Sequence, residues 1–195
     1  IGENVETIGA FAFYSLKGVD RITLPNSLKT IGNNAFEECT LITAIAFPDS
    51  VISIGDNAFA SCTALASIEI GESLESIGTD AFLSTPYVEN YPQDIVYVGN
   101  WILTCKNTEL GDREDISKYF LAGAPIGIAD YAFSYCSGLT SIVIPEGVTS
   151  IGKACKRLHL ARESSKISGF FLWGIMLEPV VKASGNLTNP KFAQE

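Results

Sequence analysis

The chain has 195 residues, of which 47% are hydrophobic, so it can bury a sizeable core and does not belong to the disordered class. Its formal net charge of −9 excludes a general nucleic-acid binder, which needs a basic face for phosphates. The longest apolar run, residues 167–177, is about half of the roughly 20 residues that a membrane-spanning helix needs. We therefore expect neither nucleic-acid binding nor membrane insertion.

A repeat of 23 residues starts near the N-terminus. An Ile followed by Gly or Ala recurs at this interval, with one longer gap after the fourth copy: Ile8, Ile31, Ile54, Ile77, Ile128 and Ile151. A fixed period of this length is typical of stacked repeats, because a single unit cannot cover its own apolar face. The repeat therefore predicts a solenoid with a continuous column of apolar side chains inside.

Each copy predicts two short strands joined by turns. In residues 65–70, Ile68 and Ile70 alternate with polar residues, as in a strand that buries one face. Residues 73–78 form a second extended stretch, and Asp80 can cap the helical turn that follows. We expect the Phe of each turn to contribute to an internal ladder of Phe36, Phe59, Phe82 and Phe133.

The residue pattern of the repeat also resembles that of a known family. Residues 139–152 read LTSIVIPEGVTSIG, and the earlier copies continue with Ala-Phe and end in Cys. This pattern resembles the BspA-like class of leucine-rich repeats. The resemblance implies a leucine-rich-repeat solenoid, a right-handed β/α superhelix with a parallel sheet on the concave face and short strands and helical turns on the other. It also implies an adhesion or interaction role at a cell surface or outside the cell.

The longer gap between Ile77 and Ile128 predicts an insertion at about residues 84–120. Residues 96–98 and 101–103 flank Gly99-Asn100, which predicts an inserted β-hairpin in the middle of the solenoid. Four aromatic residues gather here: Tyr87, Tyr91, Tyr97 and Trp101. They could contact a partner, or they could cover the flank of the solenoid, as large aromatic side chains usually do.

Three cysteines occupy the ninth position of their copies: Cys39, Cys62 and Cys136. The first copy has Leu16 at that position, so we interpret it as an apolar slot filled by buried free thiols. A metal site would need converging ligands at a defined spacing, and no histidine is supplied. We predict no metal site and no cofactor.

Asn and Asp recur at the third and fourth positions, namely Asn33, Asn34, Asp56, Asn57, Asp80 and Asp130. We interpret them as turn caps. Stacked carboxylates could hold calcium, but the glycine-rich nonapeptide that does so in β-helices is absent.

Catalytic candidates are few. His159 is the only histidine and lies four residues after Cys155, so on a helix the two would share a face. A Cys–His nucleophile pair is conceivable there, but the repeat fails in this segment and no orienting group is evident. We predict that the chain has no catalytic residue and is not an enzyme.

Repeat, charge and composition all change at Lys153. Residues 1–152 contain 6 Lys and Arg against 19 Asp and Glu, whereas residues 153–195 contain 7 against 3. We therefore divide the chain into a solenoid of residues 1–152 and a divergent basic segment of residues 153–195. The second segment could be a cap, a linker or a frame-altered tail, and residues 155–167 could form a basic amphipathic turn or two.

Two functional hypotheses follow. The first is a cell-surface or secreted module that acts as a monomer and binds a protein or glycan ligand on the concave face. The second is an architectural spacer or accessory domain within a larger polypeptide, including one that carries a catalytic domain. For the first, we expect contact through the side chains that flank the buried strand residues, with the hairpin residue Trp101 as a lip: Arg21, Thr23, Ala44, Ala46, Ser67, Glu69, Ser141 and Val143.

Overall fold

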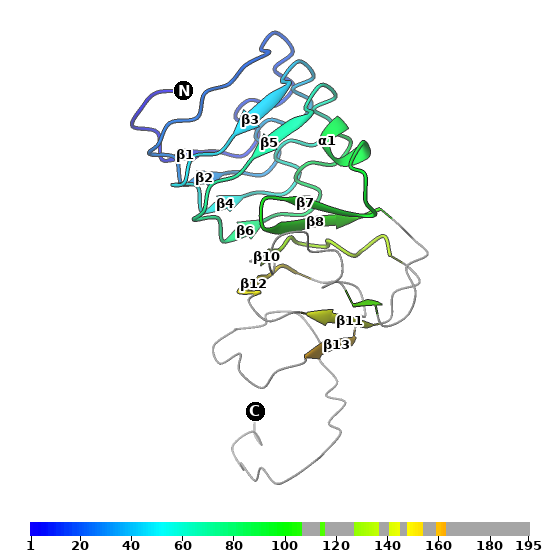
Figure 1. Cartoon of the computed structure of the whole chain (residues 1–195). Helices are drawn as coiled ribbons and strands as arrows, with labels where there is room; N and C mark the ends of the chain where they lie inside the picture. Colours follow the sequence, from blue (N-terminus) through cyan, green and yellow to red (C-terminus); the bar gives the residue numbers. More distant parts are fainter. Residues whose placement is uncertain (107–113, 116–126, 137–140, 145–147, 154–158, 163–195) are drawn as a thin grey trace, which may run out of the picture.

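A computed structural model of the chain describes residues 1–106, 114–115, 127–136, 141–144, 148–153 and 159–162. Over these residues the chain winds into a solenoid of short parallel strands, which confirms the predicted fold class (Figure 1). The strands are β1 (Thr7–Ile8), β2 (Thr30–Ile31), β3 (Ala44–Ala46), β4 (Ser53–Ile54), β5 (Ser67–Glu69), β6 (Ser76–Ile77), β7 (Ile95–Val98), β8 (Trp101–Cys105), β9 (Glu114–Asp115), β10 (Gly127–Ile128), β11 (Ser141–Ile144), β12 (Ser150–Ile151) and β13 (His159–Arg162).

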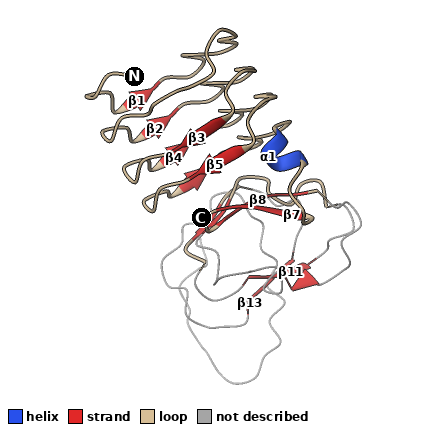
Figure 2. Cartoon of the chain, turned by 45° about the horizontal axis from the view of Figure 1, so that its top comes forward, coloured by secondary structure: helices blue, strands red, loops and turns tan. Residues whose placement is uncertain are grey.

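The N-terminal part, residues 1–83, is a regular stack that we call the first stack. The Ile-Gly strands β1, β2, β4 and β6 form one parallel sheet in that order (Figure 1). The strands β3 and β5 form a second one (Figure 2). The pairing follows the sequence period, because Ile31 faces Ile54 and Ile45 faces Ile68, each 23 residues apart. We name each 23-residue coil after its Ile-Gly strand, for example the β2 coil.

Neighbouring coils of the first stack are joined by backbone hydrogen bonds on two sides. At the Ile-Gly strand, the Gly55 N–H donates to the Ile31 carbonyl at 2.8 Å. At the turn that follows, the direction reverses, and the Phe36 N–H donates to the Ala58 carbonyl at 2.8 Å. Because the same bonds recur in each coil, the turns form a hydrogen-bonded ladder of their own without being helices.

The core of the first stack is an aromatic ladder, as the repeat predicted. The rings of Phe36 and Phe59 stack with centroids 4.9 Å apart, and those of Phe59 and Phe82 stack at 5.5 Å. Phe13 continues the ladder on the other side of Phe36 at 5.1 Å. Phe133 is buried as predicted, but no ring stacks on it within the described residues.

The insertion starts where the repeat changes its ninth residue. Thr85 takes the place of the cysteine, and its hydroxyl accepts a hydrogen bond from the Val88 N–H at the start of the helix α1 (Pro86–Glu89). The predicted hairpin then follows as β7 and β8, with Val98 opposite Trp101 and Gly99 at φ +51°. Helix α1 is the one helix in the described part of the chain.

The hairpin is part of the solenoid rather than an appendage. Strand β8 pairs in parallel with β10, and β10 pairs with β12, so that Ile102, Ile128 and Ile151 lie in register. We call β8, β10 and β12 with their turns, residues 101–105, 127–136 and 148–153, the second stack. Strand β8 therefore takes the place of an Ile-Gly strand next to β10.

The last described strands form a separate parallel sheet in the order β13-β11-β9. Its register pairs Ser141 with His159 and Ile144 with Arg162. Residues 159–162 are therefore a strand, so the basic amphipathic turn that residues 155–167 could have formed is not present in this part. The domain boundary at 153 stays a prediction.

Candidate functional site

The predicted binding face lies over β3 and β5. Ala44, Ala46, Ser67 and Glu69 are exposed on adjacent strands, while Ile45 and Ile68 point inward. This alternation follows from the pleat of a strand, in which successive side chains point to opposite faces. The result is a flat exposed surface of small side chains with a single carboxylate.

The other predicted members do not extend this sheet. Arg21 and Thr23 are exposed as expected, but residues 21–24 form no strand. Ser141 and Val143 belong to β11, which pairs with β9 and β13 instead of β5, and their side chains lie outside the description. Among the described strands, the predicted face is therefore a sheet only at β3 and β5, and its extension to the other predicted positions stays a prediction.

Trp101 is not the exposed lip that the sequence suggested. Its side chain is only 2% exposed, and its ring lies against the backbone of Gly127 on the neighbouring strand. A Cβ added at Gly127 would lie 2.5 Å from two ring atoms. Trp101 is therefore a core residue, and a partner cannot reach it without opening the solenoid.

The three tyrosines of the insertion are half-buried and cover the flank of the core, which confirms the second of the two interpretations. The Tyr87 hydroxyl donates a hydrogen bond to the Tyr97 carbonyl at 2.8 Å, and the rings of Tyr87 and Tyr91 have centroids 6.0 Å apart. Burial raises the pKa of Tyr87 to about 12, so its hydroxyl remains a proton donor at any physiological pH.

Two of the ladder cysteines are buried free thiols, as predicted. The Cys39 and Cys62 thiols donate to the carbonyls of Phe13 and Phe36 in the preceding coils. Burial raises the pKa of both thiols, that of Cys62 to about 12, which keeps them protonated and unreactive.

The prediction for Cys136 needs correction, because it forms a disulfide with Cys105 at the end of β8. The cause is the insertion, because β8 pairs with β10 and brings Cys105 next to Cys136. Cys155 lies outside the described residues. His159 lies in strand β13, so the helical face that would have paired it with Cys155 does not form at this residue.

The recurring Asn and Asp residues cap the next coil rather than their own turn. Oδ1 of Asn33 accepts the Asp56 N–H at 3.0 Å, and Oδ1 of Asp56 accepts the Thr79 N–H at 2.8 Å. Oδ1 of Asp130 does the same for the Lys153 N–H at 2.6 Å in the second stack. These residues are structural, as predicted, but their hydrogen bonds join residues 23 positions apart.

The fourth-position residues have a different reason to recur. Asn34, Asn57 and Asp80 adopt φ between +53° and +57°, the left-handed region that Asn and Asp tolerate better than most residues. They are not caps of a helical turn, because the turn is not helical. The backbone conformation favours Asn and Asp at this position, although Phe11 and Tyr131 adopt the same φ in their copies.

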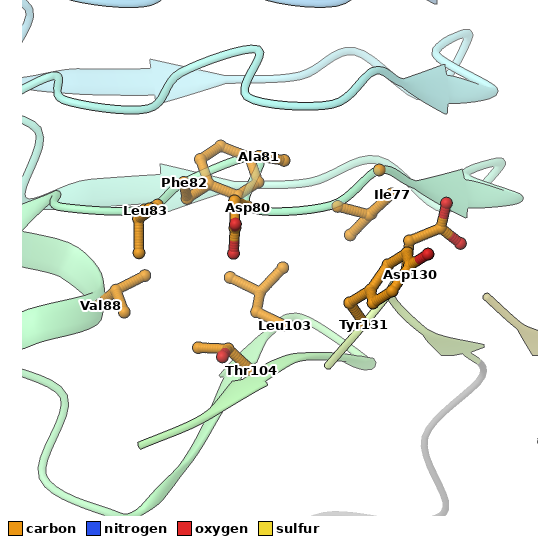
Figure 3. Close-up of a pocket in the computed structure, with 11 residues that line it drawn as sticks. Ile77, Asp80, Ala81, Phe82, Leu83, Val88, Leu103, Thr104, Asp130 and Tyr131 are labelled. Carbon is orange, nitrogen blue, oxygen red and sulfur yellow. The ribbon is translucent and has the colours of Figure 1, made fainter. Parts of the chain in front are cut away.

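A small cavity separates the first stack from the insertion (Figure 3). Its volume of about 30 Å³ is the space of roughly one water molecule. Asp80 points into it toward Leu103, and its carboxylate accepts a hydrogen bond from the Tyr135 hydroxyl at 3.4 Å. Burial is the main reason that the pKa of Asp80 is raised. The cavity is too small for a ligand.

A larger hollow of about 620 Å³ lies over the Ile-Gly strands instead of over β3 and β5. One wall carries Thr30, Ser53 and Ser76, and the opposite wall carries Asp130 and residues 150–153. Two hydrogen bonds join the walls: Asp130 N–H to the Ile77 carbonyl at 2.9 Å, and the Ser150 hydroxyl to the Glu75 carbonyl at 2.8 Å. We call this hollow the strand groove.

The strand groove was not predicted from the sequence. Its signal was present, since a Thr or Ser stands directly before the Ile of most copies. Small hydroxyl side chains fit an ordinary strand equally well, so the pattern alone indicated nothing more than exposure.

Within the described residues, no three His, Cys, Asp or Glu side chains gather closely enough to hold a metal ion. Over the same part of the chain, none of the helices is long and apolar enough to cross a membrane.

The sequence matches the family described as BspA type leucine-rich repeat region, in six copies over residues 1–108 and 115–158. Among solved structures, the chain is similar to a leucine-rich cell surface protein from Faecalibacterium prausnitzii, with 24% identity over 85% of this chain and 53% of that one, and a TM-score of 0.36. It is also similar to a leucine-rich repeat protein from Bacteroides ovatus, with 19% identity, coverage of 83% and 48%, and a TM-score of 0.40. This chain spans about half the length of these two proteins. No curated protein has significant sequence similarity to it.

Proposed function

The chain belongs to the family of BspA-type leucine-rich repeat proteins, and on this premise we propose that it is a non-catalytic binding module displayed at a cell surface or secreted. Its role is adhesion to, or interaction with, a protein or glycan ligand. The observation that carries this proposal is the exposed sheet of β3 and β5, which offers four small or polar side chains over a rigid apolar core.

The chemistry of this face suits contact with another macromolecule. Ala44, Ala46 and Ser67 carry no charge, so a partner that covers them pays little desolvation cost. The stacked phenylalanines directly behind the sheet hold it in one conformation, since Phe47 packs edge-on against Phe59 at 5.4 Å. A preformed surface loses little entropy when it binds.

The disulfide supports a location outside the cytoplasm. Disulfide bonds persist in oxidising compartments and are rare where thiols are kept reduced. Cys105 and Cys136 are joined in this structure, and both are buried in the second stack. A secreted or surface-displayed protein folds where such a bond can form.

The test is to screen the purified chain on arrays of extracellular-matrix proteins and of glycans, and then to change the face. Replacing both Ala44 and Ala46 by Arg places two long charged side chains on β3 and should abolish binding to a protein hit without unfolding the domain. Ser73→Arg, at an exposed position off the two strands, is the control for added charge.

Protein binding that survives the double Arg variant would contradict the proposed face. A chain that binds nothing on either array would favour the second hypothesis, an architectural spacer or accessory domain.

A further inference from the structure

We propose that the strand groove is a second binding site, separate from the face over β3 and β5, and that it accepts a segment of a neutral oligosaccharide. Its volume of about 620 Å³ lies within the range of small-molecule sites, which are roughly 300–1,000 Å³. The hydrogen bonds from Asp130 and Ser150 to the carbonyls of Ile77 and Glu75 fix its two walls relative to each other.

One wall of the groove is a row of hydroxyl groups. Thr30, Ser53 and Ser76 lie directly opposite one another on the parallel strands β2, β4 and β6. Parallel strands lie about 4.8 Å apart, so the row spans about 10 Å. Each hydroxyl can both donate and accept, as the hydroxyl groups of a sugar can.

Beside this row lie polar groups whose orientation is fixed by the fold. Oδ1 of Asn33 and Oδ1 of Asp56 each accept a backbone N–H from the next coil, which leaves the Asn33 amide nitrogen and the second Asp56 oxygen for other partners. The Asp130 carboxylate is held in the same way on the opposite wall and points away from the small cavity (Figure 3). The groove therefore presents fixed donors and acceptors side by side.

The charge of the groove selects among ligand classes. Asp56 and Asp130 repel an anionic ligand, and the one cation of the described lining, Lys153, already lies 3.7 Å from Asp130. A peptide strand would need an open sheet edge, whereas the groove lies over the faces of paired strands. A neutral chain of hydroxyl groups matches the donors and acceptors without a charge conflict.

The experiment measures binding of the full chain to an array of neutral gluco-, manno-, galacto- and N-acetylhexosamine oligosaccharides of three to six units. Sialylated and sulfated oligosaccharides on the same array serve as the anionic comparison. Affinity for the best neutral hit is then measured by calorimetry for three variants whose melting temperatures are checked first.

Ser76→Trp fills the groove and should weaken binding at least about tenfold, which corresponds to the loss of one or two hydrogen bonds. Ser73→Trp is the matched control, because Ser73 is an exposed serine outside both the groove lining and the face over β3 and β5, and its affinity should stay within about twofold. Asp56→Asn keeps the bond to the Thr79 N–H but removes the charge, and should weaken binding roughly tenfold.

Three results would overturn the proposal: no neutral oligosaccharide is bound, the anionic oligosaccharides bind better, or Ser76→Trp leaves the affinity unchanged. Loss of neutral-oligosaccharide binding in the variant with Arg at Ala44 and Ala46, but not in Ser76→Trp, would place the glycan on the face over β3 and β5. That outcome would refute the strand groove and leave the proposed function intact.

Discussion

The first stack and the second stack use the same repeat but are held together differently. In the first stack, every coil contributes a Phe ring to the ladder, and the β2 and β4 coils each add a buried thiol and an Asn or Asp cap. The second stack depends on contacts that occur once, such as the Cys105–Cys136 disulfide and the Trp101 ring on Gly127. Repetition spreads stability over many equal contacts, whereas the insertion concentrates it in a few.

The residue that follows the repeat Ile reflects this difference at β10. In the first stack it is Gly, because a Cβ at Gly55 would lie 2.6 Å from the Asn33 backbone nitrogen. In the β10 coil it is Ala129, which is buried and donates its N–H to Ile102 of β8 at 2.9 Å. The inserted strand β8, which pairs with β10, leaves room for the methyl group of Ala129, whereas a regular neighbouring coil leaves no such room.

The largest expected effect is in the aromatic ladder. Phe59→Ala removes a ring that stacks on both sides, and it should lower the free energy of unfolding by about 3–5 kcal/mol in urea denaturation. Phe133→Ala should cost less, because each stacked pair adds about 0.5–1.5 kcal/mol and Phe133 has none in the described residues. Equal costs would show that ring stacking does not distinguish the two stacks.

Removing the disulfide should act on the second stack alone. By the loop-entropy argument, a bond between residues 31 positions apart contributes about 3–4 kcal/mol. Replacing Cys105 and Cys136 by Ser should therefore increase amide hydrogen exchange in residues 127–136 while residues 31–62 keep their protection. Reductant should change nothing further in this variant, and faster exchange throughout both stacks would argue against the division.

Gly55→Ala tests the close approach of the coils. The added methyl group meets backbone atoms that cannot rotate away, so the substitution should cost about 1–3 kcal/mol. Gly9→Ala is the matched control at the same repeat position, since a Cβ there has no heavy atom within 4 Å. Thermal melting of both variants measures the difference, which would vanish if the glycine served only chain flexibility.

The smallest expected effect is a pH dependence from Cys62. Its pKa is raised from 9.0 to about 12 by burial, so the folded chain keeps a proton that the unfolded chain releases above pH 9. The stability contributed by the protonated thiol is complete below pH 9 and is lost as the pH rises toward 12. Cys62→Ala should show a weaker decline of unfolding free energy from pH 9 to 11, and identical slopes would contradict the buried thiol.

The sequence determined the periodic features without help from the structure. Strand alternation, the buried Phe column, the apolar ninth position and the Gly99-Asn100 hairpin turn depend on residues close in sequence or on contacts 23 positions apart. Because a repeat multiplies each signal, local preferences and tertiary contacts point to the same answer. The free thiols Cys39 and Cys62 were predicted for this reason.

Tertiary structure decided what the insertion does. The hairpin was visible in the sequence, but the pairing of β8 with β10 was not. This pairing buries Trp101 and joins Cys105 to Cys136. It also sets the walls of the strand groove, where Ser150 meets Glu75 across 75 residues. Such contacts depend on how successive coils rotate and on which strand fills the gap, and no period in the sequence encodes either.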